Sequence, residues 1–294
     1  APPESRARLP AAGPPGASFE PLMPLYLTDE TGGDEIRRAA ASGRVLGVKL
    51  YPAGATTNSA HGVTDLERCA SALDAMQECG LALMVHGEVT EKDVDVFDRE
   101  RVFIERTLAS LVDRFPGLKV VLEHVTTAEG VRFVRGAREG VAATITAHHL
   151  LLNRNALFEG GLRPHHYCLP VLKRERHRAA LVDAATGGER RFFLGTDSAP
   201  HPRHAKETAC GCAGLYTAHA GIELYAEAFD GAGALGALEA FASRNGPAFY
   251  GLEPNRGTIT LRRESWPVRE EMSMGGDVLV PFRAGDRVKW RLVT

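Results

Sequence analysis

The stretch 45–87, VLGVKLYPAGATTNSAHGVTDLERCASALDAMQECGLALMVHG, contains a strand, a helix and a second strand, and it decides the fold. Its two ends, 45–51 and 81–87, are short apolar runs, as expected for strands that are buried on both faces. Between them, DLERCASALDAMQECG begins with an acidic residue and ends at a glycine, as helices commonly do. Two strands joined by a helix predict a parallel βαβ unit.

The same alternation continues on both sides of this unit. Helical patterns cover 34–43 and 101–117, where charged residues or regularly spaced apolar residues precede a glycine or a proline. Six strands are predicted in all, and this pattern fits both a (β/α)₈ barrel and an open doubly wound sheet. The other four strands are PLMPLYLT (21–28), LKVVLEH (118–124), VAATITA (141–147) and RFFLGTD (191–197).

Polar residues at the strand ends favour the barrel. Lys49, His86, His124 and Asp197 each lie at or next to the end of a different apolar strand. Barrel enzymes take their functional groups from the carboxyl ends of several strands, whereas an open sheet gathers its ligands at one switch point. We therefore predict an α/β fold of the TIM-type (β/α)₈ barrel class.

Composition excludes several classes of function. A formal net charge of -2 in 294 residues gives no field that would attract nucleic acid or an anionic membrane surface. The sequence has no apolar run long enough for a membrane span and no signal-peptide pattern. The five cysteines are an odd number and scattered, which favours reduced thiols over a disulfide framework. We expect a cytoplasmic protein that acts on a small molecule.

Three regions are expected along the chain. Residues 1–18 are rich in Pro, Gly and Ala and are interpreted as an N-terminal remnant or linker. Residues 19–250 carry the alternating pattern and form the barrel. Residues 251–294 are expected to form a strand-rich extension that packs on the barrel.

The four strand-end residues together suggest a metal site. Two histidines and a carboxylate suit Zn²⁺, but a protonated Lys49 would repel the ion. Burial lowers the pKa of a lysine, and the neutral amine can add CO₂ to form a carbamate that bridges two metals. Such a pair polarises a carbonyl and activates water, as the opening of an amide requires. Asp197 would then be both a ligand and a proton shuttle.

Each of these residues also has a simpler interpretation. A single histidine at a strand end is more often a hydrogen-bonded structural residue, and an isolated Lys49 would extend to the surface. Asp197 could cap a helix or a turn. Lys49 could alternatively form the Schiff base of an aldolase-type barrel, but the other three residues would then share no purpose. The joint pattern favours the metal site.

Longer motifs resemble the dihydroorotases of the bacterial pyrC type, in the amidohydrolase superfamily, from about Phe19 to the C-terminus. The resemblance implies a reversible cyclisation of N-carbamoyl-L-aspartate to L-dihydroorotate in de novo pyrimidine (UMP) biosynthesis. The motifs are KLYPAGATTNSAHGVTD, LMVHGEVT, DVFDRE, LEHVTT, LRPHHYCLPVLKRERHR, FLGTDSAPHPRHAKE and CGCAG.

The resemblance also implies roles for the strand-end residues. Lys49 would be the carboxylated lysine that bridges two zinc ions, and His86 and His124 would hold the second zinc. Asp197 would bind the first zinc and act as catalytic base and acid. The family is commonly homodimeric, so a homodimer is expected. The residues that the resemblance assigns to the substrate are Thr56 and Thr57, on a mobile loop that closes over it, and Leu169, His201 and Ala213, which contact dihydroorotate.

The sequence departs from the family pattern at one point. The family opens with a strand that ends in His-x-His, whereas the first histidine of this chain is His61. The visible strands correspond to the third through the eighth of the barrel, so we expect the first two βα units to be missing and one zinc site to be incomplete. Two alternatives stay open, a truncated non-catalytic barrel that acts as a partner or scaffold and another cyclic amidohydrolase such as a hydantoinase.

Overall fold

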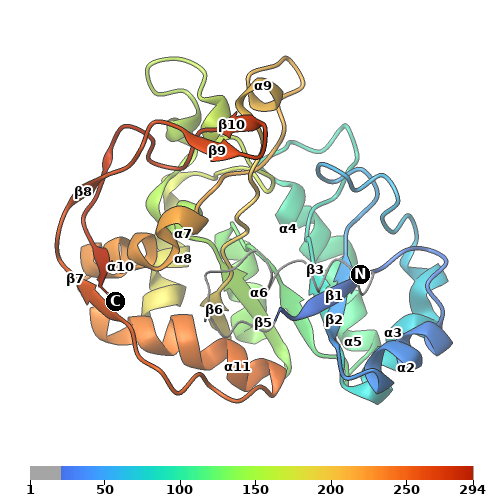
Figure 1. Ribbon diagram of the computed structural model, residues 1–294. Coiled ribbons are helices and arrows are strands. Elements are labelled where there is room, and N and C mark those ends of the chain that lie inside the picture. Colours follow the sequence, from blue (N-terminus) through green and yellow to red (C-terminus); the bar gives the residue numbers. More distant parts are fainter. Residues whose placement is uncertain (1–20, 294) are drawn as a thin grey trace.

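A six-stranded parallel sheet forms the centre of the molecule (Figure 1). The computed structural model describes residues 21–293, so the expected linker at 1–18 lies outside them. The strands pair in sequence order, and all six predicted strands are confirmed. They are β1 (Met23–Tyr26), β2 (Val45–Leu50), β3 (Ala82–Val85), β4 (Val120–Leu122), β5 (Val141–Ile145) and β6 (Phe192–Leu194). This order and direction are those of a TIM-type barrel, of which the described chain supplies six strands.

Helices connect the strands and lie outside them (Figure 1). The three predicted helical regions are confirmed, and none of the described helices is long and apolar enough to cross a bilayer. The longer helical segments are α2 (Gly33–Ala41), α3 (Ala70–Cys79), α4 (Arg99–Phe103), α5 (Ala109–Arg114), α6 (Ala128–Gly136), α7 (Ala147–Leu151), α8 (Glu175–Thr186), α9 (Arg203–Lys206), α10 (Gly221–Gly231) and α11 (Asn245–Tyr250). The short 3₁₀ or π segments are η1 (Leu66–Cys69), η2 (Ile104–Leu108), η3 (Arg154–Leu157), η4 (Pro164–His166), η5 (Ala218–Ala220), η6 (Leu235–Ala237) and η7 (Ala240–Arg244).

Local sequence sets the helix ends. Helix α3 ends at Gly80, whose φ of 72° is the left-handed conformation that glycine adopts without strain. Helix α6 begins after Thr127, whose side chain accepts a hydrogen bond from the backbone N–H of Gly130. Helix α5 ends next to the Phe115–Pro116 pair, since proline cannot continue it.

The centre of the sheet is buried on both faces. Every residue of β3, β4 and β5 is buried, which explains why these strands are continuous apolar runs. The face toward the helices joins the main hydrophobic core. On the other face, Val121, Ala142 and Phe193 pack against Phe249 and Tyr250 of α11. Helix α11 therefore fills one end of the barrel interior.

The C-terminal region forms three antiparallel strand pairs. They are β7 (Thr260–Arg262) with β12 (Arg291–Val293), β8 (Trp266–Pro267) with β11 (Arg287–Val288), and β9 (Met272–Met274) with β10 (Asp277–Leu279). Strands β11 and β12 contact α10, and β10 contacts α9. The assignment of residues 251–294 to a separate extension, divided from the barrel at residue 250, stays a prediction.

Candidate active site

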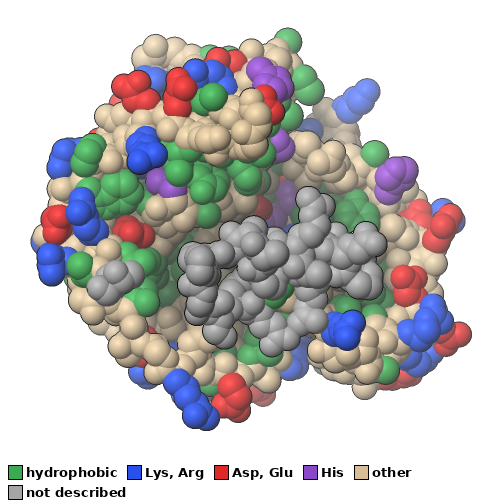
Figure 2. Space-filling view, viewed as in Figure 1, with side chains coloured by type: hydrophobic (Ala, Val, Ile, Leu, Met, Phe, Trp, Pro, Cys, Tyr) green, Lys and Arg blue, Asp and Glu red, His purple; other side chains and the backbone are tan. Residues whose placement is uncertain are grey.

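The four predicted ligands lie at one edge of the sheet. Lys49 is in β2, His86 and His124 follow β3 and β4, and Asp197 follows β6. The strands are parallel and in register, so their carboxyl ends meet at the same end of the barrel. Figure 2 shows a hollow in the visible side of the molecule with histidine side chains inside it.

A series of close contacts links three of these side chains. The rings of His86 and His124 meet edge to face, with their centroids 4.8 Å apart. The ring of Tyr51 lies 5.7 Å from that of His86, and the Lys49 ammonium lies 4.7 Å from the Tyr51 ring centroid. Lys49 also forms an ion pair with Glu123. The structure therefore brings the lysine and both histidines into one cluster.

Backbone conformation marks two of the predicted ligands. His124 and Asp197 each have a φ of 44°, in the left-handed region that non-glycine residues rarely adopt. The backbone N–H of His124 donates to Thr144 Oγ1 of β5 at 2.8 Å, which holds this conformation. Strained residues of this kind concentrate at functional sites. The strain thus distinguishes both residues from ordinary strand ends.

The electrostatics suit a cation. Burial, with a smaller effect of the Lys49 charge, lowers the pKa of His124 well below its usual value, and its Nδ1 has no hydrogen-bond partner. A neutral imidazole with a free nitrogen is the form that binds metal. Asp197 keeps some contact with solvent, yet burial raises the pKa of its carboxyl to about 7, opposed by the Lys49 charge and helped by the smaller effect of Glu123. These donors fit a divalent metal.

Two carboxylates of this cluster, Glu88 and Glu123, were not predicted from the sequence. Glu88 Oε2 lies 2.9 Å from His86 Nε2, both side chains are 1% exposed, and Glu88 Oε1 has no partner. A carboxylate that bonds one ring nitrogen fixes the orientation of the ring and leaves the other nitrogen for a ligand. Glu123, the ion-pair partner of Lys49, directly precedes His124. The only available signals were their positions in the HGE and LEH motifs.

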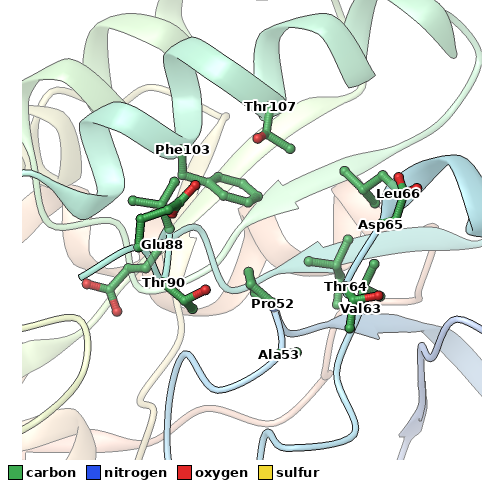
Figure 3. Close-up of a pocket in the computed structure, with 13 residues that line it drawn as sticks. Pro52, Ala53, Val63, Thr64, Asp65, Leu66, Glu88, Thr90, Phe103 and Thr107 are labelled. Atoms are coloured by element: carbon green, nitrogen blue, oxygen red, sulfur yellow. The ribbon is translucent and has the colours of Figure 1, made fainter. Parts of the chain in front are cut away.

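A cavity of about 540 Å³ lies next to the Glu88 side of the site (Figure 3). Pro52 and Val63 line it from the loop after β2, and Phe103 and Thr107 line it from the helical segment α4–η2. Glu88 also lines this cavity. The two ends of the loop that contains Thr56 and Thr57 therefore line this cavity. Glu88, which bonds His86, lines the same cavity.

The loop with Thr56 and Thr57 is held at its base. Its two arms pair through Ala53 N–H to Val63 O, 3.0 Å, and Val63 N–H to Tyr51 O, 2.8 Å. The Thr56 N–H donates to Oγ of the buried Ser59, whereas Thr57 is exposed. In the described chain, the two threonines make no hydrogen bond to the predicted metal ligands. Their contact with a substrate stays a prediction.

Leu169, His201 and Ala213 lie on segments that meet beside Asp197. His201 Nε2 lies 3.1 Å from the Ala213 carbonyl oxygen, and the Gly214 N–H donates to Tyr167 O at 3.0 Å. The loop after Asp197 is tied to the same region because the Ala199 N–H donates to Leu215 O at 2.8 Å. The structure therefore brings together the chain segments that carry these predicted substrate contacts.

A second group of donors lies in the protein interior, where the ligand atoms of His148, His149 and Cys168 are within 4.8 Å of one another. Both His149 nitrogens already have partners, Thr146 Oγ1 at 2.7 Å and Pro170 O at 3.1 Å. Burial raises the pKa of the Cys168 thiol to about 12, so the thiol keeps its proton. We interpret this group as part of the core, in which His149 and Cys168 are hydrogen-bonded and the two ring nitrogens of His148 have no partner.

Comparison with known proteins identifies the enzyme class to which the chain belongs. Residues 8–264 match the model of the Amidohydrolase family, so the chain is an amidohydrolase. The dihydroorotase of Aromatoleum aromaticum is 68% identical over 291 residues, which cover 99% of this chain and 85% of that protein. The dihydroorotase of Methylobacillus flagellatus is 64% identical, covering 98% of this chain and 83% of that protein. Within the amidohydrolases the chain belongs to the dihydroorotases, which are enzymes that act on a cyclic amide.

Solved structures agree with this assignment. The dihydroorotase of Saccharomyces cerevisiae in complex with 5-fluoroorotic acid has a TM-score of 0.84 and 35% identity, covering 92% of this chain and 80% of that one. The L-hydantoinase of Arthrobacter aurescens has a TM-score of 0.74 at 18% identity, covering 92% and 67%, and this likeness extends to the fold alone. The predicted fold class and family are therefore confirmed.

Proposed function

We propose that this enzyme catalyses the reversible cyclisation of N-carbamoyl-L-aspartate to L-dihydroorotate in de novo pyrimidine biosynthesis. The observation that carries the proposal is the arrangement of Lys49, His86, His124 and Asp197 at the carboxyl ends of parallel strands. The dihydroorotase relatives support the choice of substrate, since the ligand set alone would suit several cyclic amides.

The metal in this proposal is zinc. Lys49, as the carbamate, would bridge two zinc ions, with His86 and His124 completing the ligands of one ion and Asp197 binding the other. The unpartnered Nδ1 of His124 and the His86–Glu88 pair support this assignment. When bound, the metal polarises the amide carbonyl and activates water for attack. Glu123 would have to release Lys49 before the carbamate forms, because two anions repel each other.

Asp197 would move the proton. Its carboxylate lies where solvent reaches it, and the surrounding protein raises its pKa to about 7 without metal. A group with this pKa takes and returns a proton near neutral pH at low cost. In the hydrolytic direction, a carboxylate oxygen of Asp197 accepts the proton of the attacking water and then delivers it to the leaving amide nitrogen.

The substrate would lie between the metal ligands and the segments around His201. His201, held against Ala213 O, would face a substrate carboxylate, and the backbone at Leu169 and Ala213 would contact the ring. Thr56 and Thr57 would close over it, because a short polar loop anchored at its base can act as a lid. A cytoplasmic location and a homodimer complete the proposal.

Two measurements test this function. The first is zinc content per purified chain, prepared with and without bicarbonate: about two ions would indicate a complete site, and about one would indicate the half-site of Lys49, His86 and His124. The second is turnover of L-dihydroorotate, with hydantoin as the competing substrate.

We expect Lys49→Met and Asp197→Asn each to lower kcat by about 10³-fold or more. Thr57→Ala should lower kcat/KM without changing zinc content.

The exposed Lys92 provides a matched control, since Lys92→Met should keep both zinc and activity. Hydrolysis of hydantoin in preference to dihydroorotate would replace the proposed substrate. A folded parent protein that retains no zinc and turns over neither compound would instead support the non-catalytic scaffold.

A further inference from the structure

A buried ammonium group lies beside the predicted substrate contacts and takes no part in the proposed chemistry. Lys206, the last residue of α9, is 3% exposed. Its Nζ donates to three backbone carbonyls, Tyr167 O at 2.8 Å, Cys212 O at 2.9 Å and Gly214 O at 2.6 Å. An ammonium group has three protons, so this arrangement satisfies all of them.

These three carbonyls belong to the segments that carry the predicted substrate contacts. Tyr167 lies two residues before Leu169, and Cys212 and Gly214 are on either side of Ala213. The carbonyl of Ala213 is in turn 3.1 Å from His201 Nε2. One side chain therefore links the backbone on both sides of the predicted site.

The burial of this charge is costly, and only carbonyls compensate for it. Among the described residues, no carboxylate forms an ion pair with Lys206, so its ammonium relies on dipoles alone. Burial lowers the pKa of Lys206 to about 8, and Cys168 and Cys212 act in the opposite direction. If this position contributed only packing, an apolar side chain of similar length would stabilise the fold at least as well as a buried charge.

The charge also acts on the predicted site. Burial lowers the pKa of His201, the hydrogen bond with the Ala213 carbonyl acts against this shift, and the Lys206 charge adds a smaller lowering effect. The Tyr167 ring centroid lies 5.9 Å from the ammonium. The neighbouring Glu207 lies 2.9 Å from His165 Nε2 instead. The charged and titratable groups facing Lys206 are therefore His201, Tyr167, Cys168 and Cys212.

We propose that Lys206 is a positioning residue that holds Leu169, Ala213 and His201 at the spacing that binds an anionic substrate. This inference rests on the proposed function. Three charge-assisted hydrogen bonds add to the backbone bond from Gly214 N–H to Tyr167 O in holding these two loops together, and the positive charge favours a carboxylate ligand nearby. Lys206 touches no reacting atom, so its loss should weaken substrate binding more than it slows the chemical step.

The test compares Lys206→Met with the zinc-loaded parent protein. We expect KM for L-dihydroorotate to rise about tenfold or more, while kcat falls by less than about threefold and zinc content is unchanged. Lys119→Met is the control, because Lys119 donates to a single carbonyl, Phe249 O at 3.2 Å, beside the start of β4. A parent-like KM in a folded Lys206→Met protein would overturn the proposal.

The pH profile of the parent protein provides a second test that needs no variant. KM should stay level up to about pH 8 and rise above it, because the neutral amine has one proton fewer and leaves one carbonyl without a donor. Lys206→Arg keeps its charge at these pH values, so the rise should be absent from its profile. A parent KM that stays level to pH 9.5 would also overturn the proposal.

A thiol readout separates this inference from the function itself. Cys212 is half-buried and its own carbonyl accepts a hydrogen bond from Lys206, whereas Cys210 is exposed. We expect Lys206→Met to accelerate alkylation of Cys212 by iodoacetamide about tenfold relative to Cys210, measured by peptide mass spectrometry. The parent protein could prove inactive while Cys212 is still protected only when Lys206 is present. That result would refute the proposed function but support the positioning role of Lys206. Equal rates of Cys212 alkylation in the parent and in Lys206→Met would refute the positioning role of Lys206.

Discussion

The Glu88–His86 pair places a buried carboxylate, outside the proposed ligand set, against a proposed ligand. Glu88 is fully buried, it lies 2.9 Å from His86 Nε2, and its second oxygen has no partner. The carboxylate fixes which ring nitrogen carries the proton and makes the ring a better donor. The cost of burying this charge is offset once a cation binds nearby.

We therefore expect Glu88→Gln to weaken zinc binding by about 10- to 100-fold, since the amide keeps the hydrogen bond but lacks the charge. The measurement is zinc retention against a chromogenic chelator. Glu91→Gln is the control, because Glu91 is exposed on the same loop and lies 4.0 Å from Arg106. Identical zinc affinities in Glu88→Gln and the parent would show that His86 does not need this carboxylate.

Sequence patterns identified the candidate ligands, whose role stays a prediction, but not the buried residues that support them. Lys49, His86 and His124 could be found because a polar residue that ends a buried strand breaks an apolar pattern. Glu88 and Lys206 lie in loops, where polar residues are expected and no pattern is broken. Their burial depends on contacts across the sequence, such as that of Lys206 with Tyr167, which spacing along the chain does not encode.

At the scale of elements, one carboxylate joins a helix to the turn after His124. Glu100 of α4 is buried and accepts hydrogen bonds from the N–H and hydroxyl groups of both Thr126 and Thr127. Burial raises the pKa of Glu100, while the charge of Lys173 and the threonine bonds act against this shift. The start of α6 is thereby fixed against α4, and with it the strand end that carries His124.

Glu100→Ala would leave four buried donors without an acceptor. We expect the free energy of unfolding to fall by roughly 3–5 kcal/mol, because each unsatisfied buried group carries a desolvation penalty. Urea denaturation measures this change. Glu105→Ala, at an exposed position of the same helical segment paired with Arg101, should cost less than about 1 kcal/mol. Similar losses in the two variants would contradict the anchoring role.

At the scale of the whole molecule, the alternating pattern was sufficient for the sheet order, because a buried parallel strand cannot be polar on either face. All six strands and the three predicted helical regions agree with the structure. The insertion of Phe249 and Tyr250 of α11 into the barrel interior could not be foreseen, since the pattern of a short helix does not specify its partner. Topology therefore follows from local patterns, and the filling of the interior follows from tertiary packing.

The buried histidines make the stability of the whole fold depend on pH. His148 is fully buried, neither ring nitrogen has a partner, and burial lowers its pKa to about 3. The unfolded chain binds a proton at this histidine below about pH 6.5 and the folded chain does not. Stability is therefore complete well above pH 6.5 and falls as the pH drops through 6.5 toward 3.

Between pH 7 and 5, His148 alone should lower the free energy of unfolding by about 2 kcal/mol. His148→Leu removes this proton uptake and two unsatisfied nitrogens at similar volume, so we expect it to match or exceed the parent at pH 7 and to gain stability over it at pH 5. Urea denaturation at both pH values measures the difference, with the exposed His61→Leu as control. A loss of several kcal/mol at pH 7 that parallels a loss of bound metal would contradict this account, because it would mean that His148, His149 and Cys168 hold an ion.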